Sequence, residues 1–109
     1  MPYNEEIEAR IRKITSNWEN TDQKNMFGGI CHLMNGNMFG GVYKDFLILR
    51  IGEEKAKEAL ALPFVKEFDI TGRPMKGWVM VEQAGFVDDE ALADWLNQAK
   101  KFVCILPAK

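Results

Sequence analysis

The sequence predicts a two-layer α+β domain: a mainly antiparallel sheet with helices on one face, in the order α-βββ-α-ββ-α. Three observations lead to this prediction. They are an Asn35-Gly36 pair between two apolar runs, amphipathic helix patterns at both ends of the chain, and two short apolar runs in its second half. A chain of 109 residues that is 47% hydrophobic suits one compact core, so a single domain over residues 1–109 is expected.

An amphipathic helix is predicted near the N-terminus, within residues 4–19. Its apolar side chains recur at steps of four, three and four residues, which places them on one helix face. Asn4 is a suitable N-cap, and Glu5 and Glu6 suit the positive end of the helix dipole. The polar stretch 20–25 is expected to end the helix and to serve as a connection. The apolar stripe consists of Ile7, Ile11, Ile14 and Trp18.

Two further helices and two further strands are predicted in the second half of the chain. Strong helix formers fill residues 53–62 up to Pro63, and a longer apolar stripe runs through residues 88–106. The apolar runs 64–70 and 77–82 are typical of strands.

The centre of the chain is predicted to form a hairpin around Asn35-Gly36. This pair favours a two-residue type I′ turn, because both central positions of that turn need a positive φ. Counting outward from the turn gives the expected register. It pairs Met34 with Asn37, Leu33 with Met38, His32 with Phe39, and Cys31 with Gly40.

The tetrapeptide MFGG occurs at 26–29 and again at 38–41. In the predicted hairpin the first copy enters the outgoing strand and the second lies in the return strand, so we interpret the repeat as coincidence. Neither glycine pair has the strand-to-helix context of a phosphate-binding loop. Gly40 and Gly41 are expected to permit a bend in the strand or the close approach of a helix.

A second two-residue turn at Lys44-Asp45 leads into the run 46–51, although a longer loop is also consistent with the residues. Because side chains alternate along a strand, the predicted sheet then has two distinct faces. An apolar face is expected to contact the helices; it contains Cys31, Leu33, Met38, Val42, Leu47, Leu49 and Ile51. The opposite face mixes polar and apolar residues, namely Ile30, His32, Met34, Phe39, Tyr43, Phe46, Ile48 and Arg50.

We interpret the mixed face as an interaction surface, because contiguous exposed apolar area usually marks a binding or dimer interface. The alternative is that a helix or the N-terminal segment covers this face within the monomer. In the predicted register His32, Phe39 and Arg50 form a cross-strand row in which a cation lies on an aromatic ring. The predicted surface consists of Ile30, His32, Phe39, Tyr43, Phe46, Ile48 and Arg50.

No catalytic or metal-binding constellation is found. His32 is the only histidine, and strand alternation directs its neighbour Cys31 to the opposite face, which excludes a Cys-His dyad in a regular strand. Cys31 and Cys104 show no redox or zinc spacing, and both are expected to be reduced thiols in the core. No cofactor is expected.

A weaker prediction is an anion site at the segment TGRPMK. Arg73 and Lys76 flank a proline turn, where two cations near exposed backbone amides can hold a phosphate or a carboxylate. The alternative is a solvated turn without a ligand.

Charge and hydropathy bear on partners and location. A formal charge of -2 lacks the basic excess that supplies most affinity for nucleic acid, so direct binding of nucleic acid is disfavoured. The acidic N-terminus is unlike a signal peptide, and no apolar run approaches membrane-spanning length. A soluble, cytoplasmic protein is expected.

A series of segments from about residue 24 to the C-terminus forms a recognisable pattern, in which TGRPMKGW is the most specific block. The segments are MFGG, NGNMFGGV, LILRIG followed by ALALP, FDITGRPMKGWVMV, LADWL and KKFVCILPAK. In this pattern the sequence resembles the N-terminal domain of the TfoX (Sxy) competence regulators. It implies the two-layer α+β fold and a role linked to DNA uptake, in which full-length regulators work with the cyclic-AMP receptor protein. Those regulators carry a second, helical domain that this chain does not match, and the family offers no catalytic residues to transfer.

The expected function is therefore that of a non-enzymatic regulatory domain that acts through protein contacts, as a homodimer or with another protein. The alternatives are a small-molecule binder or an enzyme that uses the loop of Arg73 and Lys76.

Overall fold

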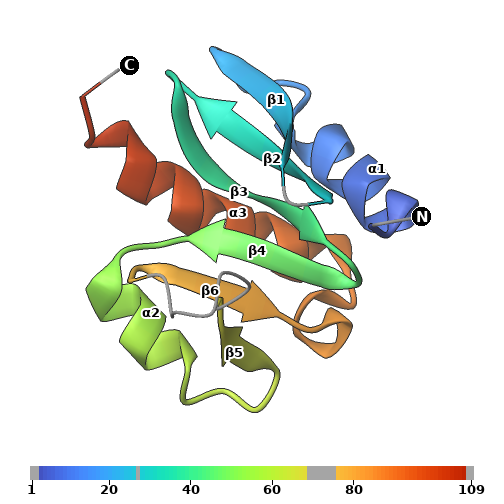
Figure 1. The fold of residues 1–109 in the computed structure, drawn as a ribbon, viewed down its shortest axis with the longest axis vertical. Helices are drawn as coiled ribbons and strands as arrows, with labels where there is room; N and C mark the ends of the chain where they lie inside the picture. Colours follow the sequence, from blue (N-terminus) through green and yellow to red (C-terminus); the bar gives the residue numbers. More distant parts are fainter. Residues whose placement is uncertain (1–2, 27, 69–75, 108–109) are drawn as a thin grey trace.

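The computed structural model describes residues 3–26, 28–68 and 76–107. One antiparallel sheet of six strands, in the order β1-β2-β3-β4-β6-β5, carries α1 and α3 on one face, so the predicted α+β class is confirmed (Figure 1). The strands are β1 (Thr21–Met26), β2 (Gly29–Met34), β3 (Asn37–Tyr43), β4 (Phe46–Arg50), β5 (Val65–Glu67) and β6 (Trp78–Val81). The helices are α1 (Glu5–Thr15), α2 (Glu53–Ala59), the short 3-10 helix η1 (Gln83–Phe86) and α3 (Asp89–Cys104).

Local capping explains where the two long helices begin. The Asn4 side chain accepts hydrogen bonds from the backbone N–H groups of Glu6 and Ile7, which have no partner inside α1. The Asp88 side chain does the same for Ala91 in α3. All three predicted helices are present, each shorter than its predicted range.

Strand β1 was not predicted, because residues 20–25 were interpreted as a polar connection. In the structure Thr21–Met26 pairs with β2 along its whole length. It lies at the edge of the sheet, and residues 22–25 are exposed to solvent. An edge strand of this kind buries little of its own surface, so it carries no apolar alternation that the sequence would reveal.

The two predicted turns are confirmed. Asn35 and Gly36 have φ values of 54° and 83°, as a type I′ turn requires, and the adjacent pairs of β2 and β3 have the predicted register. Lys44 also has a positive φ, of 52°, and the tight turn that it starts pairs Val42 with Leu47.

Away from the turn, a bulge in β3 changes the register. His32 lies opposite Gly40 and Cys31 opposite Gly41, whereas Leu33 remains opposite Met38. The predicted pairs of His32 with Phe39 and of Cys31 with Gly40 were therefore wrong. Phe39 is the extra residue of this bulge, since two residues of β3 span the step that one residue of β2 makes.

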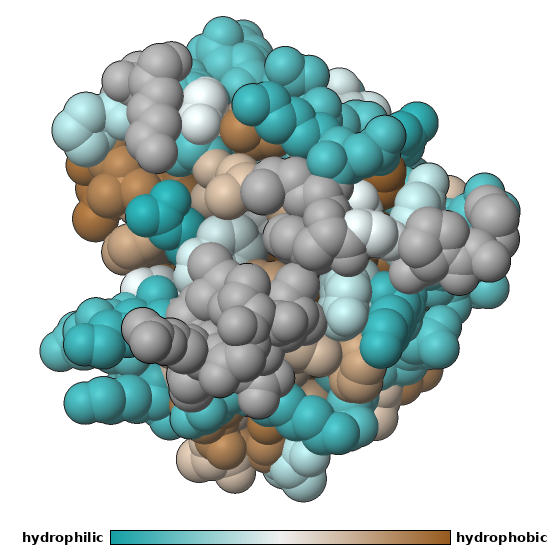
Figure 2. Space-filling view, in the orientation of Figure 1, coloured by the Kyte–Doolittle hydropathy of each residue, from teal (hydrophilic) through white to brown (hydrophobic). Residues whose placement is uncertain are grey.

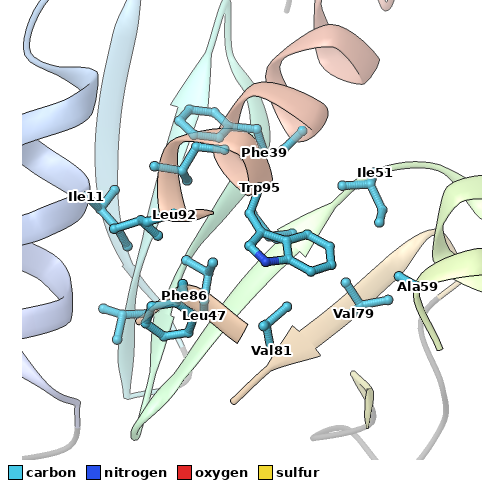
Figure 3. Close-up of a cluster of buried hydrophobic side chains, with 14 of the residues drawn as sticks. Ile11, Phe39, Leu47, Ile51, Ala59, Val79, Val81, Phe86, Leu92 and Trp95 are labelled. Atoms are coloured by element: carbon cyan, nitrogen blue, oxygen red, sulfur yellow. The ribbon is translucent and has the colours of Figure 1, made fainter. Parts of the chain in front are cut away.

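The bulge decides which side chains of β2 face the helices. An inserted residue shifts the alternation of side chains by one position. The side chains of β2 and of the first half of β3 therefore lie on the opposite face of the sheet from the one that an unbulged pairing with β4 would give. The predicted core face was right for the residues after the bulge and wrong for Cys31, Leu33 and Met38. Ile30, Met34 and Phe39 pack instead in the helix-covered core with Val42, Leu47, Leu49 and Ile51. Figure 3 shows Phe39 in this core with Leu47 and Ile51.

The glycines of the two MFGG segments permit close contact between strands. A Cβ atom on Gly41 would overlap the carbonyl oxygen of Ile30, and one on Gly29 would overlap that of Val42. The group that approaches these glycines is the backbone of a neighbouring strand. The predicted alternative, the close approach of a helix, was wrong.

Replacing Gly41 with alanine is expected to lower the free energy of unfolding by about 1–3 kcal/mol, because backbone atoms on the facing strand must move to accept the new methyl group. Urea unfolding followed by circular dichroism measures the change. Asn25→Ala, an exposed substitution on the edge strand, serves as the control. Equal stability of the Gly41→Ala variant and the wild type would contradict the close approach of β2 and β3.

Candidate functional site on the outer face of the sheet

The seven residues predicted to form one interaction surface do not share one face. Ile30, His32 and Phe39 lie on the helix-covered face and are buried, because the bulge turns this part of the hairpin inward. The mixed face was thus assigned incorrectly at these three positions.

The remaining members lie elsewhere. Tyr43, Phe46 and Ile48 belong to the cluster on the opposite side of the sheet. Arg50 ends β4, and its guanidinium carbon lies 5.6 Å from the ring centroid of Phe102 on α3. The predicted row of His32, Phe39 and Arg50 is therefore not formed.

The side of the sheet opposite α1 and α3 carries a second apolar cluster, which we name the outer face. Among the described residues no helix contributes a side chain to it, and Figures 1 and 2 view the molecule from this side. The rings of Phe68 and Trp78 lie 5.6 Å apart within it. The outer face consists of the buried Cys31, Ile48, Phe68, Trp78 and Met80 and the half-buried Met38, Tyr43 and Phe46.

Two lysines border the aromatic part of the outer face. Lys44 Nζ lies 5.4 Å from the ring centroid of Tyr43, and Lys66 Nζ lies 5.7 Å from that of Phe46. Lys66 also forms an ion pair of 3.1 Å with Glu82. Cations over aromatic faces make this border attractive to groups that are both apolar and acidic.

The two cysteines are free, and they have different environments. Cys31 is buried, which raises the pKa of its thiol to about 11, so it remains protonated at neutral pH. Cys104 is exposed, with its Sγ atom 3.4 Å from Met34 Sδ, so its expected place in the core was wrong. Cys31 and His32 point to opposite faces, as alternation predicted.

His32 forms a buried polar contact with Glu8 that the sequence did not reveal. Its ring is 1% exposed, and Nε2 lies 2.8 Å from Glu8 Oε1 on α1. The second carboxylate oxygen of Glu8 accepts a hydrogen bond from Arg12, one helical turn later. The group links the helix layer to β2 through the only histidine of the chain.

The Glu8 carboxyl is tuned by opposing effects. Burial alone would raise its pKa, but the hydrogen bonds and charges of His32 and Arg12 outweigh burial and hold the pKa below its ordinary value of 4.5. The pair therefore contributes stability that is fully present above the ordinary pKa and is lost as the pH falls through the lower, folded-state pKa.

A sequence pattern that hinted at this pair does exist. Glu8 lies beside Ile7 and Ile11 at the border of the apolar stripe, a position that a helix packed on a sheet tends to bury. The partner is 24 residues away, and only the bulge in β3 directs His32 towards it.

The predicted anion site lies partly outside the described residues. Arg73 falls in the segment 69–75, which lies outside the described residues. Lys76 is exposed and lines a pocket of about 250 Å³ between α2 and the sheet. The pocket is bounded by Glu53, Ala56, Lys57, Leu60, Glu67, Lys76, Gly77 and Trp78.

Within residues 3–26, 28–68 and 76–107, no three His, Cys, Asp or Glu side chains gather in a way that would ligate a metal ion. Within the same ranges no helix has the length and apolar character needed to span a bilayer.

Glu8→Gln tests the buried contact between Glu8 and His32. At neutral pH the variant is expected to lose about 1–3 kcal/mol in the free energy of unfolding, because a charged hydrogen bond to a buried partner is removed. The difference from the wild type should shrink as the pH falls through the folded-state pKa of Glu8, since the carboxyl then becomes neutral in both states. Urea titrations over a series of acidic pH values measure both quantities.

Glu6→Gln is the matched control, because Glu6 occupies the exposed side of the same helix. It should leave stability nearly unchanged. A Glu8→Gln deficit that stays constant down to low pH would contradict an ionised pair.

Comparison with known proteins gives one match. The family model of the TfoX N-terminal domain covers residues 13–103, which is most of the chain. No curated protein and no solved structure matches this chain. The matched range runs from the last turn of α1 to residue 103 in the last turn of α3 and includes the whole sheet. The chain therefore belongs to the TfoX N-terminal domain family.

Proposed function

We propose that this chain is a non-enzymatic regulatory domain that acts through protein contacts in the control of competence, the uptake of DNA. Membership of the TfoX N-terminal domain family supports the regulatory role. The observation that carries the proposal is the outer face, an apolar cluster on a sheet surface to which no described helix contributes.

The composition of the outer face favours a protein partner. A solvated sheet face normally alternates with polar residues, whereas here half-buried aromatic and sulfur-containing side chains form the accessible part, namely Met38, Tyr43 and Phe46. Aromatic residues and methionine are enriched where proteins bind one another. The lysines at the border add complementarity to a partner segment that carries acidic as well as apolar side chains.

The environments of His32 and Cys31 support a role without catalysis. His32 is shielded from solvent and paired with Glu8, and the raised pKa of Cys31 keeps its sulfur in the unreactive thiol form. Neither group is available to a substrate in this arrangement.

Complementation with a Phe46→Glu variant tests the proposal in the native host after deletion of the gene. The deletion is expected to change the frequency of natural transformation, and the wild-type gene should restore the original frequency. The Phe46→Glu gene should fail to restore it, because a carboxylate is placed in the apolar part of the outer face. Transformation frequency and transcript levels of DNA-uptake genes are the measurements.

Val87→Glu is the matched control, because Val87 is apolar, 78% exposed and not a member of the outer face. Circular dichroism checks that both variants are folded. Unchanged transformation after deletion would contradict the competence role, and full complementation by Phe46→Glu would contradict the outer face as the contact surface.

A second candidate function, small-molecule binding, is favoured by the pocket between α2 and the sheet. Its floor is apolar, formed by Ala56, Leu60 and Trp78. Two lysines and two glutamates surround it, and none of these forms an ion pair within the described part of the chain; they are Glu53, Lys57, Glu67 and Lys76. Balanced charges around an apolar floor suit a small zwitterion with an apolar side chain, such as a hydrophobic amino acid.

A panel of hydrophobic amino acids tests this candidate by thermal unfolding. Binding is expected to raise the unfolding temperature in a concentration-dependent way, and Lys76→Met should reduce the shift. Lys101→Met, at an exposed position on α3, should not. No shift with any member of the panel would contradict this candidate.

A further inference from the structure

Strand β1 presents an open edge of the sheet. It pairs with β2 on one side, and it is the terminal strand in the sheet order. Residues 22–25 are exposed, so nothing in the described part of the chain covers the edge. An open edge is a ready template for a further strand unless the chain protects it.

The backbone groups of β1 that point away from β2 can be identified. The carbonyl of Asn20 accepts a hydrogen bond from the N–H of Asn35, so this residue is directed towards β2. Because these groups alternate along an antiparallel strand, those of Thr21, Gln23 and Asn25 point outward. In agreement, the N–H of Gln23 donates a hydrogen bond to the side chain of Asp22, 2.8 Å away.

The charges of β1 are arranged symmetrically about Gln23. Asp22 lies opposite Leu33 and Lys24 lies opposite Cys31, so both project on the side of the outer face. Neither side chain forms an ion pair with a described residue.

We propose that two copies of this chain form a homodimer by antiparallel pairing of their β1 strands, with Gln23 on the two-fold axis. In this register each Gln23 N–H, which in the single chain is donated to the Asp22 side chain, is donated instead to the Gln23 carbonyl of the second copy. The released Asp22 carboxylate then lies directly opposite Lys24 of that copy. A two-fold interface uses the same patch on both copies, and the sequence Asp-Gln-Lys is complementary to its own reverse.

Neighbouring registers lack this complementarity. Centring the pair on Asp22 or on Lys24 sets like charges opposite each other. Centring it between Gln23 and Lys24 leaves the charged residues opposite amides. The charges therefore select one register instead of protecting the edge.

The dimer joins two sheets into one. Antiparallel pairing about an axis normal to the sheet keeps corresponding faces on the same side, so the two outer faces become neighbours on one surface. This inference goes beyond the proposed function and does not depend on it, since the edge and the outer face consist of different side chains.

Charge reversal tests the dimer by sedimentation velocity over a wide range of protein concentration. The wild type should show about twice the monomer mass of 12.5 kDa. Asp22→Lys and Lys24→Asp each create two like-charge contacts and should weaken association by about tenfold or more. The double variant, with both charges exchanged, should restore it. Asp94→Lys, at an exposed position on α3, is the control for net charge.

Disulfide trapping tests the register independently, in a Cys104→Ser background that removes the exposed native thiol. A directly opposed pair of this type has Cα atoms about 5.5 Å apart, within the reach of a disulfide. Gln23→Cys is expected to form a covalent dimer on mild oxidation, whereas Asp22→Cys, which lies off the axis, should not.

The proposal is overturned by a wild type that stays monomeric at all concentrations, by a dimer that neither charge reversal weakens, or by trapping of Asp22→Cys in preference to Gln23→Cys. Loss of association in the single variants with recovery in the double variant supports it. Because the readout is mass and cross-linking, it is separate from the transformation assay of the proposed function.

Discussion

The arrangement of this molecule depends on one insertion in the sheet, the bulge at Phe39 in β3. Phe39 and Gly40 together span a step that His32 makes alone, so the side chains of β2 turn over relative to those of β4. Gly41 allows β2 and β3 to approach closely beside this bulge, where a Cβ atom would meet the Ile30 carbonyl. Without the insertion, Ile30, Met34 and Phe39 would point away from the helices that now cover them.

The bulge also fixes how the N-terminal helix is held. It directs His32 into the layer between α1 and the sheet, where Glu8 and His32 form a polar contact inside an otherwise apolar interface. Phe39 fills the adjacent space, with its ring 5.5 Å from Trp18 and 6.1 Å from His32. A buried pair of this kind adds little net stability compared with apolar packing, but breaking it is costly, so it favours one position of α1 over others.

Much of the fold could be predicted from local patterns, and the errors share a physical cause. The Asn35-Gly36 pair predicted the hairpin, and the apolar stripes at helical spacing predicted α1 and α3. Both signals depend on residues that are only a few positions apart. The edge strand β1 was missed because a solvated edge needs no apolar alternation. The residues of the predicted interaction surface lie on two faces of the sheet because of the bulge, and a bulge depends on contacts between strands that a local pattern does not contain. The Gly40-Gly41 pair was compatible with several backbone conformations.

Nuclear Overhauser contacts from His32 and Cys31 test the bulge most directly, because these neighbours lie on opposite faces of β2. With the bulge, protons of the His32 ring contact the Glu8 side chain on α1, and the Cys31 β-protons contact the methyl groups of Ile48. A straight, unbulged pairing would reverse these contacts, with Cys31 against Leu47 or Leu49 and His32 away from α1. Observation of that reversed set would contradict the account.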